Sequence, residues 1–296
     1  MSVRTRGTLS VGADRIGVND GLAGRVAHSI FEEALKRRAL CNSATPRMVK
    51  YRSSGFLKSE SVRKKFAAER LSAYRPIVLD ALGFDRYRRL DLLVLNFLED
   101  VGGTGKKKLC VATLSCQLAE IENFGQFENT MLWCNVTKHA VRRLVQRNKA
   151  RSVGDLMPIL KMATGWIAIA NLMQHQGSFV VPVEDGLFCC GMDGEVQDAD
   201  TKKIKARLGS IRTFIGLDQM RPDTLNSWQK MVNFGGLKST PRALALVKES
   251  TWLNSDIVDS NTRRLFKVMG YEGQKWDVRF NRWKTESNLA SPYSSN

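Results

Sequence analysis

The chain has 296 residues, 43% of them hydrophobic, and its 46 lysines and arginines outnumber 29 aspartates and glutamates to give a formal net charge of +17. This composition excludes a disordered tail, because it supplies enough apolar side chains for a core, and the length allows one large domain or two ordinary ones. A positive charge of this size favours a polyanionic partner, because its field concentrates phosphates at the surface.

The sequence contains no segment typical of a membrane-spanning or secreted protein. The longest apolar stretches, 92–98 and 166–173, are too short to cross a bilayer, and the first seventeen residues hold no apolar core of signal-peptide length. None of the six cysteines forms a C-x-x-C pair, which favours free thiols in a reducing compartment over a zinc site. We therefore predict a cytoplasmic protein with no metal, no other cofactor and no membrane partner.

The first third of the chain is the most basic part. Segment 22–40 has the apolar spacing of an amphipathic helix, and 60–82 predicts a second helix with a basic face. Residues 1–89 contain 19 lysines and arginines against 8 aspartates and glutamates. We interpret 1–129 as a mainly helical, nucleic-acid-binding region, the alternative being a solvated basic surface. The residues of the second helix expected to contact nucleic acid are Arg63, Lys64 and Lys65.

Two apolar segments that follow are harder to assign. Segment 90–100 is apolar on too many faces for an exposed helix and is compatible with a buried strand or a buried helix. Segment 102–108 reads as a loop, and it lacks the spacing of a phosphate-binding P-loop. Segment 109–122 suggests a strand followed by a turn of helix.

Local signals are stronger in the centre of the chain. Thr137 is a credible N-cap for a helix over 138–149, and Ser152 with Asp155 forms a capping-box pattern at the start of a helix over 152–172. The sequence then changes period to β-branched and aromatic runs.

These runs are interrupted at Glu184-Asp185-Gly186, a hairpin signal, and segment 203–217 reads as one or two further strands. The region 130–220 is thus predicted to be two helices followed by a small antiparallel sheet. Beyond it, 221–296 is predicted to be a helical, basic extension. Its aromatic and basic segment either contacts nucleic acid through Arg263 and Arg264 or packs onto the core. The fold class expected overall is α+β.

The helix predicted over 138–149 carries a row of cationic and ionisable groups. His139, Arg143 and Arg147 are spaced i, i+4, i+8 and should lie close to one face, with Arg142 and Gln146 beside them. Such a row repels itself, and a phosphodiester placed against it would relieve the repulsion. Arginine grips phosphate with two donors, and histidine titrates near neutral pH. These groups suffice in principle for metal-independent RNA cleavage, with a proton transferred by histidine and charge stabilised by arginine.

The central part of the chain contains the segment T137-K-H-A-V-R-R-L-V-Q-R147, the second helix that follows it, and the strands FVVPVEDGLFCC and S210-I-R-T-F-I215. In these elements it resembles the RelE/ParE-like superfamily of RNase toxins, which includes barnase-like, EndoU-like and colicin-type folds. Asn148 stands where the family pattern has glycine. The resemblance implies that His139 is the acid or base, that Arg143 and Arg147 bind phosphate, and that Thr213 contacts substrate. It also implies an acidic antitoxin or inhibitor as partner.

Three functions are compatible with these observations. The first is a metal-independent endoribonuclease of toxin or defence type, with RNA favoured over DNA. The alternative is a non-catalytic DNA- or RNA-binding protein of a mobile element or phage. The third is a metal-dependent nuclease built on clustered carboxylates such as Glu120, Glu122 and Glu128. His175 is a further candidate, as a second acid or base beside His139.

Overall fold

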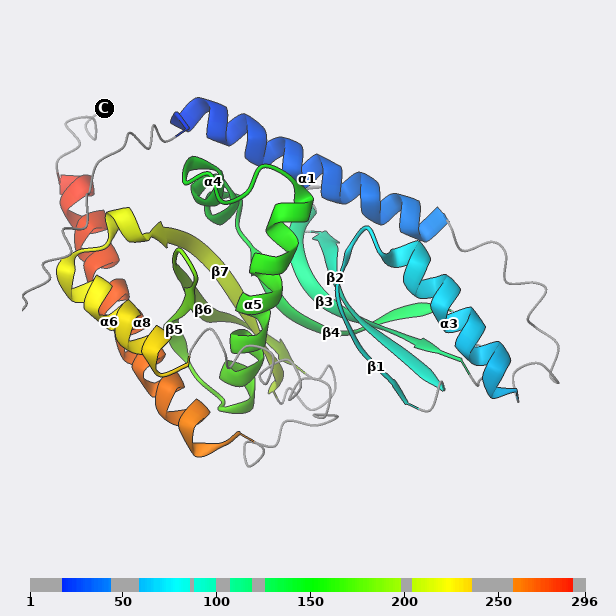
Figure 1. Ribbon diagram of the computed structural model, residues 1–296. Coiled ribbons are helices and arrows are strands. Elements are labelled where there is room, and N and C mark those ends of the chain that lie inside the picture. Colours follow the sequence, from blue (N-terminus) through cyan, green and yellow to red (C-terminus); the bar gives the residue numbers. More distant parts are fainter. Residues whose placement is uncertain are drawn as a thin grey trace, which may run out of the picture.

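Seven strands form the centre of the protein in a computed structural model, which describes residues 18–43, 59–85, 88–99, 107–118, 126–197, 204–235 and 258–289. The strands are β1 (Val78–Asp85), β2 (Arg89–Glu99), β3 (Lys107–Gln117), β4 (Phe127–Val136), β5 (Gly177–Val183), β6 (Gly186–Gln197) and β7 (Ile204–Gly216). They form one curled sheet in the order β1-β2-β3-β4-β7-β6-β5 (Figure 1). Every pairing is antiparallel except that of β4 with β7.

Helices cover both faces of this sheet. They are α1 (Asp20–Ser43), α3 (Glu60–Tyr74), α4 (Lys138–Gln146), α5 (Val153–Leu172), α6 (Pro222–Asn233) and α8 (Ser260–Leu289). Helix α1 lies along the top of Figure 1, with α4 near its N-terminal half and α3 near its C-terminal end. Helix α5 packs against β1 and against β4 to β7, so that it lies inside the curl of the sheet.

The parallel pair β4–β7 explains the order of the chain. After β4 the chain passes through α4 and α5, forms the β5–β6 hairpin, and returns as β7 beside β4, with Cys134 opposite Gly209. A parallel neighbour requires such a crossover connection, which helices commonly provide. The strands predicted after α5 are therefore the second half of a sheet that begins at β1. The predicted boundary between 129 and 130 falls within β4.

The predicted fold class, a helical basic N-terminal region with a small separate central sheet, is wrong. Three long strands, β1 to β3, occupy the region expected to be mainly helical, and they continue into the central sheet. The helix predicted over 60–82 ends at Tyr74, two residues before Pro76, and the chain then enters β1. Pro76 has no backbone N–H with which to continue the helical hydrogen-bond pattern, so this boundary has a local cause.

The burial of β2 and β3 explains why their pattern was ambiguous. In β3 every residue from Leu109 to Cys116 is buried. Asn96 accepts a hydrogen bond from Arg38 on α1, while Cys134 contacts Thr164 on α5. The register places Asn96 and Cys134 on opposite faces of the sheet. Strands covered on both faces lack the alternation of apolar and polar residues that identifies a half-exposed strand.

Most of the local predictions are confirmed. The helix expected over 22–40 extends from Asp20 to Ser43, and the two central helices begin where their caps predict. Thr137 accepts a hydrogen bond from the backbone N–H of Ala140, and Ser152 and Asp155 form the reciprocal capping box. The hairpin turn lies at 184–185, between β5 and β6.

Helix α8 closes the far edge of the sheet by packing along β5. It approaches so closely that a side chain at Gly273 would overlap the backbone of Phe179 and Ser178. His175 fills the same contact, with its ring edge-on to Phe266 at 5.1 Å and to Phe179 at 5.7 Å. His175, the residue considered as a second acid or base, is thus a packing residue beneath α8.

Helix α5 is long and apolar enough to cross a membrane, but its position explains its composition. Within the described residues it is the one helix that meets these criteria. Most of its side chains are buried against strands on several sides, including the fully buried Trp166. Helix α5 is accordingly the central core helix of this fold.

Candidate nucleic-acid interface

Helix α4 separates its apolar and polar residues sharply. Ala140, Val141, Leu144 and Val145 are buried, and all four face the rest of the protein. At 100° per residue, the opposite face carries the residues predicted to meet a nucleic acid. They are His139, Arg142, Arg143 and Gln146. The structure therefore brings these four side chains together on the outward face of one short helix.

A carboxylate from α1 already neutralises part of this face. Asp20 forms an ion pair with Arg142, and its Oδ1 accepts a hydrogen bond from Gln146 Nε2 at 2.6 Å. Gln146 Oε1 in turn accepts a hydrogen bond from Arg143 Nη1 at 3.0 Å. The cationic row is thus stabilised within the protein, and its repulsion does not by itself require a bound phosphate.

His139 is exposed and has a lowered pKa. Partial burial of the imidazole is the larger cause of the lowered pKa, and the positive charge of Arg143 is the smaller one. The neutral form, which accepts a proton, is therefore favoured at pH 7. His175 lies beneath α8 rather than beside His139, so among the described residues the structure does not pair the two histidines as acid and base.

Arg147 and Thr213 are placed apart from this face. Arg147 follows the last helical residue and forms an ion pair with Asp218, with 3.1 Å between Nη1 and Oδ2. Asn148 has a φ of 53°, in the left-handed region that favours glycine or asparagine, and so the chain leaves the helix axis here. Thr213 is half-buried within β7, opposite Cys189. No hydrogen bond among the described residues links Thr213 to His139.

A cavity of about 760 Å³ opens between α1, the start of β3 and the start of α4. We call it the lysine cavity, because three lysines line it. The register of β3 and β4 pairs Cys110 with Asn135, which brings Lys107 and Lys108 to the same end of the sheet as Lys138. The residues lining it are Phe31, Glu32, Leu35, Phe97, Lys107, Lys108, Leu109, Asn135, Val136, Thr137 and Lys138.

Sequence reasoning missed this cavity. The run of lysines at the start of β3 reads as a loop in the sequence, and nothing in the sequence connects it with the helix that begins thirty residues later. The cap at Thr137 was a usable signal for one wall. The opposite walls depend on strand pairing and on where α1 packs.

The other predicted contacts divide between two regions. Lys64 and Lys65 are exposed and Arg63 is half-buried on α3, near the other end of α1 (Figure 1). Arg264 is exposed and lies over the ring of Phe234 at 5.5 Å. Arg263 donates a hydrogen bond from Nε to the carbonyl of Val258 at 2.8 Å, a contact that fixes the start of α8.

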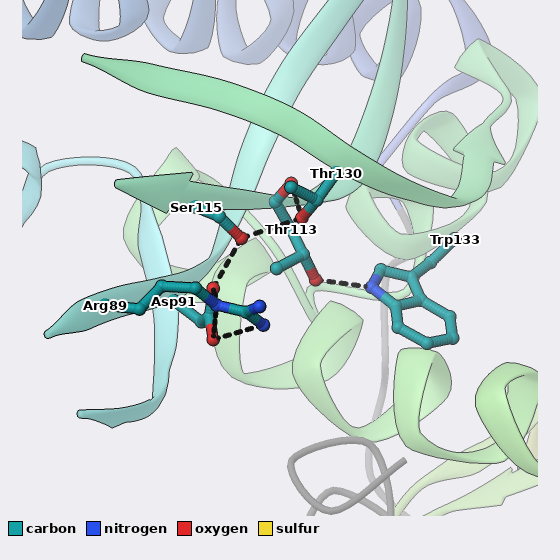
Figure 2. Close-up of polar contacts among 6 residues, drawn as sticks. All are labelled: Arg89, Asp91, Thr113, Ser115, Thr130 and Trp133. Carbon is teal, nitrogen blue, oxygen red and sulfur yellow. Dashed lines mark hydrogen bonds and ion pairs between the residues drawn. The ribbon is translucent and has the colours of Figure 1, made fainter. Parts of the chain in front are cut away.

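Figure 2 shows a second polar cluster, which crosses β2, β3 and β4. Asp91 accepts two hydrogen bonds from Arg89, with Nε at 2.9 Å, and a third from Ser115. Ser115 also contacts the hydroxyl of Thr130 at 2.9 Å. Further along β3, Thr113 accepts a hydrogen bond from Trp133 Nε1 at 2.8 Å. A carboxylate within a largely apolar strand was visible in the sequence.

This cluster has the composition of a structural network. The Asp91 carboxylate is satisfied by three donors, and Ser115 lies against a carboxylate rather than an imidazole. The three histidines of the chain lie on α1, on α4 and beneath α8. A serine without a neighbouring base is a weak nucleophile. We therefore assign the cluster to stability.

Replacing Asp91 by alanine is expected to lower the free energy of unfolding by roughly 2 kcal/mol, because it leaves the buried hydroxyl of Ser115 and the guanidinium of Arg89 without their acceptor. Urea denaturation measures this difference. The matched control is Asp218→Ala, which removes the more exposed partner of Arg147 and should cost less than about 1 kcal/mol. Equal losses for the two variants would contradict a structural role for the network.

No group of three or more histidine, cysteine, aspartate or glutamate side chains within the described residues is arranged to hold a metal ion. Glu128 is exposed on β4, while Glu120 and Glu122 lie outside the described residues. Comparison with protein-family models, with curated protein sequences and with solved structures gave no match.

Proposed function

We propose that the protein binds nucleic acid, RNA in preference to DNA, through the lysine cavity and the outward face of α4. The observation that carries this proposal is the convergence of Lys107, Lys108 and Lys138 around one cavity, in which Glu32 is the one acidic lining residue among those that the structure describes. Arg143 extends the positive surface along α4, beside Arg142, whose charge Asp20 offsets. Contacts between such cations and phosphates supply most of the affinity of sequence-independent nucleic-acid binding.

The non-catalytic form of this proposal has more support than the ribonuclease. Of the four residues expected to act in cleavage, His139 and Arg143 share a face, while Arg147 pairs with Asp218 and Thr213 lies within β7. One acid or base and one arginine leave the leaving group without an evident proton donor. A soluble, cytoplasmic nucleic-acid-binding protein, such as one of a mobile element or phage, accounts for the arrangement with fewer requirements.

One observation favours the endoribonuclease as a second candidate. His139 is exposed, neutral at pH 7 and electrostatically coupled to Arg143, which is what a general base beside a phosphate ligand requires. Cleavage by such a base would increase as the pH rises through the lowered pKa of His139 and then level off, because the unprotonated imidazole is the active form.

The test is a binding and cleavage assay in EDTA. End-labelled single-stranded RNA, single-stranded DNA and duplexes of equal length are incubated with the protein at increasing salt. We expect binding that weakens steeply with salt and leaves the RNA intact. Cleavage by the parent protein but not by His139→Ala would establish the ribonuclease instead. Absence of binding to every nucleic acid at low salt would refute both candidates.

A further inference from the structure

We propose that the lysine cavity holds a single unstacked base, so that the protein selects single-stranded over double-stranded nucleic acid. This inference rests on the proposed function and names the part of the nucleic acid that enters the site. Three features of the cavity support it: its size and apolar lining, the amide of Asn135 among its lining residues, and the lysines around it.

The floor of the cavity suits a planar aromatic ring. Leu35 and Phe97 are the partly exposed apolar side chains of its lining, above the buried Phe31, Leu109 and Val136, and its volume of about 760 Å³ lies within the roughly 300–1,000 Å³ common for small-ligand sites. The apolar lining residues are Phe31, Leu35, Phe97, Leu109 and Val136. A base enters such a cavity only after it has left its stack and its pairing partner. Single strands present bases in this form, whereas a duplex keeps them inside.

Asn135 supplies a polar group inside this apolar cavity. Its register partner is Cys110, which in turn lies opposite Asn96, and Asn96 contacts Arg38 of α1. The side chain of Asn135 is therefore on the α1 side of the sheet, where the cavity lies. Asn135 is partly exposed and lines the cavity, while its Oδ1 lies out of contact with solvent. An amide is a common reader of base edges, and the accessible part of this side chain is the polar group that a base in the cavity would meet.

The rim has the charge that the phosphates beside such a base require. Lys107 and Lys108 are exposed at the start of β3, and Lys138 extends over the ring of Phe31 at 5.6 Å. Lys138 also begins α4, whose first N–H groups form the positive end of the helix dipole. A base on the floor and phosphates at the rim would thus be contacted at the same time, which matches the stacking-plus-charge mode of single-strand binding.

The experiment measures the affinity of the full chain for a fluorescent single-stranded RNA oligomer and for a duplex of the same length. We expect the single strand to bind roughly tenfold more tightly, as expected from burying one base. Leu35→Trp places an indole in the cavity and should remove this preference by lowering the affinity for the single strand to that for the duplex. Leu40→Trp, on the same helix but outside the cavity, is the control and should keep it. Asn135→Ala gives a second test that keeps the cavity open, with an expected loss of about fivefold for the single strand.

The outcomes separate the two proposals. Equal affinity for single strand and duplex, or an unchanged preference in both Leu35→Trp and Asn135→Ala, overturns the base-binding inference and leaves nucleic-acid binding in place. No binding to either oligomer at low salt overturns the proposed function. Thermal melting of each variant shows whether it is folded, and if Leu35→Trp is not, Asn135→Ala decides.

Discussion

Replacing Lys107, Lys108 and Lys138 together by alanine is expected to weaken binding of single-stranded RNA on the order of 100-fold at about 0.1 M salt. The three side chains lie around one cavity, so one strand can contact all of them. A plot of log affinity against log salt falls with a negative slope, and each lost phosphate contact on a single strand makes that slope less steep by about 0.7. The salt dependence of the triple variant should therefore be less steep by about 2, which a salt titration measures.

The matched control removes three lysines from other elements. Lys161 is on α5, Lys230 on α6 and Lys267 on α8, and none of them lines the cavity. The alanine variant of these three has the same net charge as the first triple variant. The slope of log affinity against log salt for this control should change by less than the value of about 0.7 that corresponds to one phosphate contact. Equal weakening by both triple variants would mean that the total charge, and not the lysine cavity, determines binding.

Replacing Trp166 by alanine is expected to lower the free energy of unfolding by about 3–5 kcal/mol, the largest stability effect that we predict for a single residue. Trp166 is fully buried and lies on α5, at the centre of the curled sheet. Removing its indole leaves a cavity that strands on several sides cannot close. Urea denaturation with an unchanged m-value measures the loss.

Trp166→Phe is the informative companion variant. The indole Nε1 is buried and has no hydrogen-bond partner in the described part of the chain. Phenylalanine keeps much of the buried surface and removes the unsatisfied donor, so the loss should stay below about 1.5 kcal/mol. If Trp166→Ala cost less than Trp166→Phe, α5 would not be the central core helix.

The amino-acid sequence by itself determined the elements whose signals are local. Thr137 and Ser152 define helix starts through their own side chains, and Glu184 to Gly186 define a hairpin turn. The outward face of α4 also follows from the sequence, because helical spacing places His139 and Arg143 one turn apart. The same spacing failed at Arg147, because the helix ends at Gln146 and the Arg147 side chain pairs with Asp218 beyond it.

Only the tertiary structure decided the sheet and the lysine cavity. Strands β2 and β3 are buried on both sides because α1 lies against one face and the other face lines the inside of the curl that holds α5, and no periodicity within a strand reports such cover. Lys108 and Lys138 are thirty residues apart in sequence. They meet because β3 and β4 pair in one register, and Phe31 and Leu35 join them because α1 packs across that end. Strand register and helix docking are long-range choices of the whole core, which a local pattern does not contain.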